Sequence, residues 1–269
     1  EIGREAFAGH SELEKIRLPE TLETLRSGAF AGCVRLRRVK LPASVTAVED
    51  SVFARCVSLT DIEADAASQN YRAMDGVLFD RRGKLLCCYP AGRQEADYKV
   101  PLGVAAIAPQ AFSWCQAIQE IQLPPGLNRI CDGAFAYCVM LRVIDLPRGV
   151  TEIGSRAFMG CGRLSSVNMP GTLTQLGAEA FSGCGQLREI VFPCMLTRLE
   201  DGVFRDCASL PVLELPEGLR EIGEAAFSGC RALTGVNLPV QLTAIGSEAF
   251  RDCAELKTLE IPAGVTRVG

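Results

Sequence analysis

The chain has 269 residues and a formal net charge of −4. A charge this small gives no global attraction to nucleic acid or to an anionic membrane surface. No run of about 18 apolar residues is present, so no segment is expected to insert directly into a bilayer. The hydrophobic fraction is 48%, but only 6% of the residues are aromatic, which predicts a largely aliphatic core.

A repeat of 23 residues runs through the whole sequence, and we call each copy a rung. Its most constant residue is a phenylalanine, found at positions 7, 30, 53, 112, 135, 158, 181, 204, 227 and 250. A fixed period in the twenties predicts a solenoid, because no single rung can bury its own apolar face and each must stack on its neighbours. We therefore expect one domain over residues 1–269 with about ten rungs, interrupted by an insertion at about 66–100.

Each rung is predicted to contain a strand followed by a short helical segment. In one of the last rungs, Val236 and Leu238 alternate as in a strand, and Pro239 ends it because proline cannot donate to a ladder. Residues 246–253 then fit one or two helical turns, with a serine or an acidic residue near the N-terminus. The predicted fold is an α/β solenoid with a parallel β-ladder on its concave face and short helices or 3₁₀ turns on its convex face.

Nine of the thirteen cysteines stand three residues after a repeat phenylalanine. Equivalent side chains of stacked rungs point in parallel rather than at each other, so we expect buried, reduced thiols that act as small hydrophobic residues. His10 takes this position in the first rung and is expected to pack there. No tetrahedral set of cysteine and histidine ligands and no nucleophile–base motif occurs, so we expect no metal, no cofactor and no enzymatic activity.

The insertion contains a predicted β-hairpin. Residues 75–80 form one strand, Arg81, Arg82 and Gly83 the turn, and residues 84–90 the second strand. Insertions in a solenoid map to one face and are often binding elements. The alternative is a hairpin that only repairs the interrupted ladder.

Aromatic residues gather near this insertion. Trp114 and Tyr137 stand two residues after their phenylalanines, where most rungs have Gly or Asp, and consecutive rungs should bring the two rings into stacking distance. The insertion itself adds Tyr71, Phe79 and Tyr89. These rings are either covered by the inserted segment or form an exposed anchor for a protein or a glycan.

Basic residues mark the other end of the predicted concave face. Lys15, Arg17, Arg38 and Lys40 flank the inward residues of the first two strands. They are either solvated charges that pair with acidic residues of the third rung, worth at most about 1 kcal/mol each, or a patch for an acidic ligand.

The unit A-F-x-x-C-x-x-L-x-x-[IVL]-x-[LIFM]-P-x-x-[VL]-x-x-[IVL]-G resembles the BspA-type (Treponema pallidum-type) leucine-rich repeat. The resemblance implies a bacterial cell-surface or secreted module, extracellular, that mediates adhesion by binding a protein or a glycan. The alternative function is a structural spacer that presents another domain and has no ligand of its own. The chain begins and ends in the same phase of the repeat, which suggests a piece of a longer array without its signal peptide. A monomer is expected.

Overall fold

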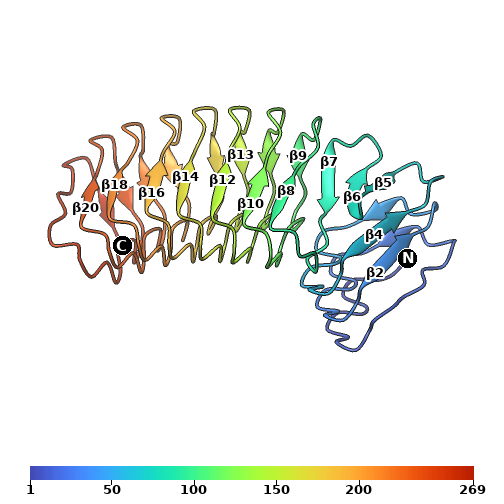
Figure 1. Cartoon of the computed structure of the whole chain (residues 1–269). Helices are drawn as coiled ribbons and strands as arrows, with labels where there is room; N and C mark the ends of the chain where they lie inside the picture. The colour runs from blue at the N-terminus through green and yellow to red at the C-terminus, as the bar shows by residue number, and fades with distance from the viewer.

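The structure is a computed structural model that describes all residues from 1 to 269. The chain winds into an elongated solenoid with its termini at opposite ends (Figure 1). Each rung contributes a strand to one or both of two parallel ladders and a ring to an internal column. The solenoid has about eleven rungs.

The first ladder is formed by the strands that follow each Cys-x-x-Leu segment. Glu120 pairs with Val143 and Ile121 with Ile144, so the register advances by one full repeat per rung. The middle residue of each strand points inward, as Ile121 does, and its neighbours face solvent. The strands are β2 (Arg38–Leu41), β4 (Asp61–Ala64), β8 (Asp97–Lys99), β10 (Glu120–Gln122), β12 (Val143–Asp145), β14 (Ser166–Asn168), β16 (Glu189–Val191), β18 (Val212–Glu214) and β20 (Gly235–Asn237).

The second ladder lies on the far side of each rung and has shorter strands. They are β1 (Thr24–Leu25), β3 (Ala47–Val48), β7 (Leu85–Cys88), β9 (Ala106–Ile107), β11 (Arg129–Ile130), β13 (Glu152–Ile153), β15 (Gln175–Leu176), β17 (Arg198–Leu199), β19 (Glu221–Ile222), β21 (Ala244–Ile245) and β22 (Arg267–Val268).

The predicted helical segments are absent, and the expectation of convex-face helices was wrong. The phenylalanine-containing segments are tight turns whose amides bond across rungs: Phe158 N–H donates to Ala180 O of the next rung at 2.7 Å. The second residue after phenylalanine is also left-handed, as at Gly160 with φ of 72°, and a right-handed helix cannot pass through that conformation. Accordingly, no helix with the length and apolar character of a membrane span is found.

Two internal columns join the rungs. Adjacent phenylalanine rings lie parallel, as for Phe158 and Phe181, whose centroids are 5.1 Å apart with planes 3° from parallel. Eight of the nine repeat cysteine thiols, all except Cys115, also donate to the phenylalanine carbonyl of the preceding rung, and Cys161 Sγ lies 3.1 Å from Phe135 O. The repeat cysteines are buried as expected, except that Cys253 is only half-buried. They are hydrogen-bond donors as well as small hydrophobic residues.

One rung is hidden within the apparent insertion. Tyr89 occupies the ring column, stacked on Phe112 with a centroid distance of 5.0 Å. Tyr98 of β8 pairs with Ile121 of β10 in the first ladder. Residues 84–106 are therefore a degenerate rung with a tyrosine in place of phenylalanine, and we number it rung 4.

The remaining inserted residues form a hairpin of β5 (Tyr71–Met74) and β6 (Val77–Asp80), which we call the septum hairpin. β6 pairs in antiparallel fashion with both β5 and β7, which confirms the predicted β6–β7 hairpin. All three apolar residues of β6 are fully buried, but Leu78 packs in one hydrophobic core while Val77 and Phe79 pack in another. The period-2 alternation of a strand thus makes β6 a partition between two cores.

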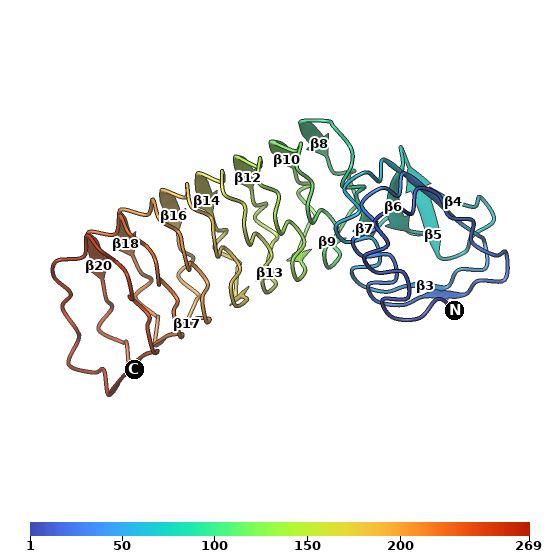
Figure 2. The same ribbon diagram turned by 90° about the horizontal axis from the view of Figure 1, so that it is seen from below.

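These cores define two blocks. The N-terminal block, rungs 1–3 over residues 1–64, has a core of 16 buried residues that includes Leu78. The C-terminal block, rungs 4–11 over residues 84–269, has a core of 53. Neither β4 with β8 nor β3 with β7 forms a ladder pair, and the N-terminal block bends away from the line of the C-terminal block (Figures 1 and 2). We call the septum hairpin and the rung surfaces on either side of it the joint.

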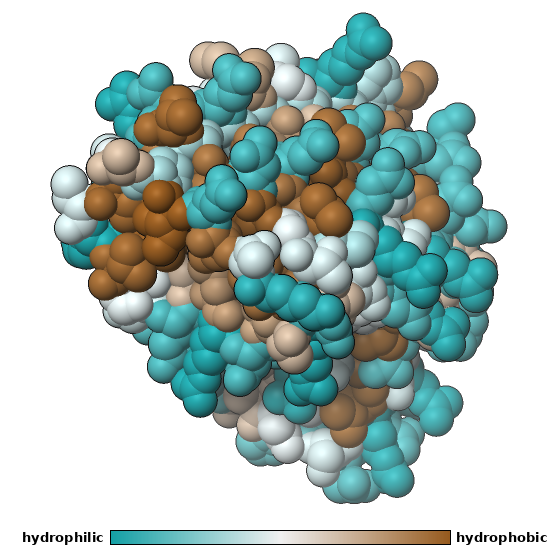
Figure 3. All heavy atoms as spheres, turned by 90° about the vertical axis from the view of Figure 1, so that its left-hand side faces the viewer, coloured by the Kyte–Doolittle hydropathy of each residue, from teal (hydrophilic) through white to brown (hydrophobic).

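The terminal rungs have a neighbour on one side only. His10 is exposed in this structure rather than packed, and its ring meets the ring of Phe7 edge-on, with the two centroids 5.7 Å apart. At the other end Ile261 and Val268 are 49% and 59% exposed. Figure 3 faces this end and shows hydrophobic side chains gathered among polar ones.

Candidate binding surfaces at the joint

The structure separates the predicted aromatic residues into buried and accessible ones. Phe79 and Tyr89 are 0% and 2% exposed, because one lies on the inner face of β6 and the other in the ring column. Both therefore belong to the core and offer almost no surface to a partner in this structure. Trp114, Tyr137 and Tyr71 remain partly exposed.

Trp114 and Tyr137 form part of a side-chain stack that crosses the joint. Their centroids are 4.5 Å apart with planes at 27°, which confirms the expected stacking. Arg55 of rung 3 places its Cζ 4.9 Å from the centroid of Trp114. Tyr137 rests on Gly160, where an added Cβ would lie 2.7 Å from Tyr137 Cδ1. Both faces of both rings are therefore occupied, and their edges are what a partner meets.

The backbone at this stack is unusual. Arg55, Trp114 and Tyr137 have φ values of 61°, 64° and 61°. A left-handed conformation costs roughly 1–2 kcal/mol for a residue with a side chain, which explains why most rungs have Gly or Asp at this position. Aromatic stacking and a cation–π contact contribute about 0.5–1.5 and 0.5–1 kcal/mol, so the stack is comparable in size to the strain that it opposes.

The predicted basic residues lie on the first ladder of the N-terminal block, not beside the stack. Lys15, Arg17, Arg38 and Lys40 are all exposed. Arg38 pairs in register with Asp61, and Lys40 with Glu63. Only Lys40 forms an ion pair, with its Nζ 3.9 Å from Asp65 Oδ2. The first two rungs thus keep a cationic surface that neighbouring carboxylates neutralise only in part.

A wide polar groove opens beside these residues on the first-ladder side of the joint. Its volume is about 740 Å³, and its lining has no hydrophobic residue. Arg93 spans it, pairing with Glu95 at 2.8 Å and donating to the carbonyl of Asp75. Its guanidinium also lies 5.4 Å from the ring of Tyr89. The groove therefore offers hydrogen-bonding groups whose charges are largely balanced within it.

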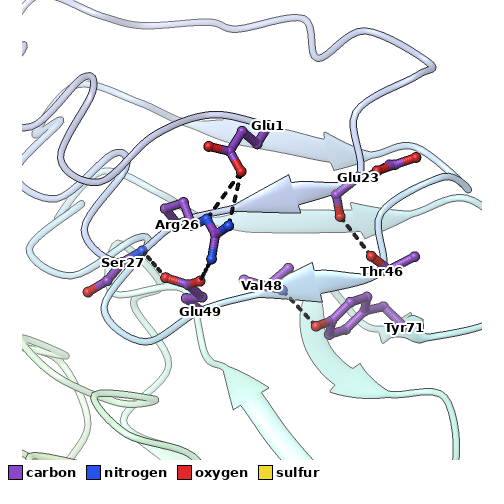
Figure 4. A network of polar contacts seen from close by, with 8 residues as sticks. All are labelled: Glu1, Glu23, Arg26, Ser27, Thr46, Val48, Glu49 and Tyr71. Atoms are coloured by element: carbon purple, nitrogen blue, oxygen red, sulfur yellow. Dashed lines mark hydrogen bonds and ion pairs between the residues drawn. The ribbon is translucent and has the colours of Figure 1, made fainter.

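A narrower cleft, which we call the joint cleft, opens on the second-ladder side. It has a volume of about 260 Å³ and lies between residues 46–54 of rung 3, the septum hairpin, and residues 85–110. The cleft exists because β3 has no strand partner on this side. Val48 N–H instead donates to Tyr71 Oη at 2.7 Å (Figure 4), and Asn70 Nδ2 donates to Val45 O at 3.3 Å.

Cys87 and Cys88 line this cleft, where their surroundings disfavour the thiolate form. Burial, followed by the charge of Asp80, raises the pKa of the Cys87 thiol to about 12. Burial also raises the pKa of Cys88. A neutral thiol is a poor nucleophile and metal ligand. No group of three or more histidine, cysteine or acidic side chains is arranged to hold a metal ion.

Sequence reasoning found the stack and the basic surface but missed both openings at the joint. The openings join segments that are far apart in sequence, such as Thr46 and Gln110. The sequence did contain a signal for rung 4, because Tyr89, Tyr98 and Pro101 keep the repeat spacing to Phe112, Ile121 and Pro124. The interruption of the repeat therefore lies between residues 65 and 83, where the joint forms.

Comparisons with known proteins place the chain among bacterial repeat proteins. The BspA type leucine rich repeat region matches residues 1–80, 95–211 and 197–269. A leucine-rich repeat protein from Eubacterium ventriosum has a TM-score of 0.67 at 22% identity, covering 91% of this chain and 59% of its own. The structure of the pneumococcal vaccine antigen PcpA has a TM-score of 0.62 at 21% sequence identity, and the match covers 95% of this chain and 62% of the antigen.

A third solved structure, a leucine rich cell surface protein from Faecalibacterium prausnitzii, has a TM-score of 0.51 at 27% identity and covers 94% of this chain and 61% of its own. The chain thus spans about three fifths of the length of these proteins. A search of curated proteins gave no significant match.

Proposed function

Because this chain belongs to the BspA-type leucine-rich repeat family, we propose that it is a cell-surface or secreted repeat module that binds a protein partner at its joint. The proposed location outside the cell is supported by similar proteins, of which one is described as a cell surface protein and another as a vaccine antigen. The long exposed surface of a solenoid suits recognition of another macromolecule, and no catalytic role is proposed.

The observation that carries the proposal is the loss of repeat regularity at the joint. There the ladders part, openings of about 260 and 740 Å³ appear on two sides, and bulky side chains replace Gly or Asp at left-handed positions. A spacer needs only regular rungs. Retained strain and surface openings are typical of binding sites rather than of scaffolding.

A protein partner fits the stack better than a glycan does. Sugars bind aromatic side chains by covering a ring face, but Arg55 and Tyr137 already cover the two faces of Trp114. A partner that contacts ring edges, the Arg55 guanidinium and the polar groove needs no rearrangement of the stack. The basic surface of rungs 1 and 2 favours an acidic region on such a partner.

The spacer alternative rests on the regularity of the C-terminal block. From Phe135 to Phe250 the ring centroids stay between 5.1 and 5.7 Å apart, with little variation from rung to rung. That block has surface openings of its own, of about 490, 260 and 420 Å³, but it keeps the regular rung stacking that a spacer requires.

Binding to a panel of immobilised extracellular-matrix proteins and to a glycan array tests the proposal. Arg55→Gly and Trp114→Gly restore the glycine that stands at this position in rungs 2 and 7. We expect each to weaken binding to a matrix protein at least tenfold, as for interface anchors of roughly 2 kcal/mol.

Val212→Ser on β18, where the equivalent residue of β14 is Ser166, is the matched control and should bind normally. Binding that survives both joint variants would move the site elsewhere on the solenoid. Failure to bind any member of either panel would favour the spacer.

A further inference from the structure

The joint cleft has the size of a site for one side chain. Its volume of about 260 Å³ is below the roughly 300–1,000 Å³ usual for drug-sized ligands. Much of its wall is apolar, including Val48, Val52, Leu85 and Ala108. An aliphatic stem that entered here would be removed from water on several sides.

The polar groups of the cleft carry one sign of charge. Among its lining residues are Glu49, Asp50 and Asp80, with no lysine, arginine or histidine. Two of these carboxylates already have partners within the protein. Glu49 accepts from Arg26 Nη1 at 2.7 Å and from Ser27 N–H at 2.9 Å (Figure 4). Asp80 Oδ1 accepts the N–H groups of Lys84 and Leu85, each at 2.7 Å.

Asp50 is different, because the joint removes its partner. At the same repeat position Asp132 Oδ1 accepts Ser155 N–H, and Asp201 Oδ1 accepts Glu224 N–H, each at 2.8 Å from the next rung. The chain after Asp50 leaves the solenoid path for the septum hairpin, so no such N–H reaches its carboxylate. Asp50 is exposed at the mouth of the cleft and forms no side-chain hydrogen bond and no ion pair in the structure; partial burial, followed by the charges of Asp132 and Glu49, raises its pKa.

We propose that the joint cleft receives a lysine or arginine side chain of the protein partner, with the aliphatic stem against the apolar wall and the cationic end at Asp50. The assignment rests on the proposed binding function. It identifies the chemistry of one contact: the carboxylate that pairs with the following rung at Asp132 and Asp201 is left at Asp50 for a cation from outside. An acidic or purely apolar side chain would leave Asp50 without a partner.

Binding of small probes to the whole chain tests this assignment directly. The first probe is Nα-acetyl-lysine N-methylamide, whose side-chain ammonium group is free. The second is the norleucine equivalent, which has the same aliphatic stem without the ammonium group. Methyl NMR signals of Val48, Val52 and Leu85 report on occupancy of the cleft. We expect the lysine probe to shift these signals with saturation and the norleucine probe to bind at least fivefold more weakly.

Two matched pairs of variants locate the site. Ala54→Met should fill the cleft and abolish probe binding, whereas Ala31→Met should not, because Ala31 holds the same repeat position outside the cleft and Met159 shows that the position accepts methionine. Asp50→Asn should weaken the lysine probe about threefold to fivefold, the range of a solvent-exposed ion pair, and Asp201→Asn should leave it unchanged.

Equal binding of the two probes, or lysine binding that survives Ala54→Met, would overturn the assignment. The probe experiment can fail or succeed independently of the proposed function, because it measures binding of small molecules to the cleft and uses no matrix protein. Probe binding without any protein partner would leave the cleft chemistry standing and remove the adhesion proposal.

Discussion

The two blocks are built from the same repeat but reach stability in different ways. In the C-terminal block, eight rungs share a core of 53 buried residues with Val77 and Phe79 of the septum hairpin, and each inner rung packs against two others. The N-terminal block has three rungs and a core of only 16 buried residues, one of them Leu78 from the septum hairpin. The stability of a solenoid is close to the sum of the stabilities of its rungs and of the contacts between neighbouring rungs. A short block has few such contacts, so it depends most on a segment that covers the core of its last rung. The septum hairpin has that role here.

The largest expected effect appears in alkaline solution, where the C-terminal block has more buried thiols with a raised pKa than the N-terminal block, which has Cys33 and Cys56. Burial raises the pKa of Cys161, Cys184, Cys207 and Cys230 above that of an unfolded thiol, about 8.5. Because each folded pKa is the higher one, stability is intact below about pH 8.5 and falls as pH rises, by about 1.4 kcal/mol per unit for each thiol. Four thiols together remove roughly 5 kcal/mol per unit.

Urea unfolding of the C-terminal block at pH 8, 9 and 10, under reducing conditions, measures this slope. The four Cys→Ser changes keep a donor for the phenylalanine carbonyls but remove the titration. The quadruple variant should therefore lose the part of the slope that these four thiols cause and keep the part caused by the other buried thiols of the block, such as Cys88 and Cys115. The same slope with and without the thiols would contradict the explanation.

The next largest effect compares an inner ring with a terminal one. Phe181 is fully buried and stacks on rings on both sides, at 5.1 and 5.6 Å. Phe181→Ala should therefore lower the free energy of unfolding by about 3–5 kcal/mol. Phe7 is partly exposed and stacks on Phe30 alone, so Phe7→Ala should cost clearly less. Equal losses in urea titrations would argue against nearest-neighbour stabilisation.

Adjacent residues of β6 separate the blocks most directly. Leu78→Ala should lower the stability of the N-terminal block by about 2–5 kcal/mol, since Leu78 belongs to that core. Phe79→Ala should act instead on the C-terminal block. Hydrogen exchange followed by mass spectrometry measures the two blocks separately, through peptides from residues 24–62 of the N-terminal block and 106–153 of the C-terminal block. Faster exchange in both blocks for each variant would show that the blocks unfold together.

The smallest effect concerns the stack at the joint. Trp114→Gly loses stacking and a cation–π contact but relieves a left-handed backbone, so we expect the free energy of unfolding to change by less than about 1 kcal/mol. Gly160→Ala is the opposing control, because its new Cβ would lie 2.7 Å from Tyr137 Cδ1. It should destabilise the protein more than Trp114→Gly does. The reverse order in thermal unfolding would mean that the stack stabilises the joint more strongly than its contacts indicate.

Sequence spacing was sufficient for the first ladder, the burial of the repeat cysteines and the pairing of Trp114 with Tyr137, because each follows from a constant period. The second ladder was not predicted, since its two-residue strands are too short to show the alternation of a strand. It was insufficient where one residue type replaces another in the same role. Tyr89 fills the ring column and Gly92 the cysteine position, so rung 4 lacks both of the residues that identify a rung. Short segments rich in helix-capping residues also resembled helices, although their amides bond to the next rung.

The joint cleft could not be predicted at all, since its shape depends on where the hairpin diverts the chain. Asp50 looks like an ordinary surface acid in the sequence. Its lack of a partner becomes visible only when Asp132 and Asp201 are seen bonded to the rung that follows them.

The interruption of the ladders has a mechanical consequence. Hydrogen bonds between rungs run roughly along the long axis, so tension applied at the two ends loads the rungs in series, and extension begins at the weakest link. At the joint β4 and β8 do not pair, and the ring column stops at Phe53 and resumes at Tyr89. A molecule under tension would therefore extend first at the joint, while the rungs of the long C-terminal block stayed folded.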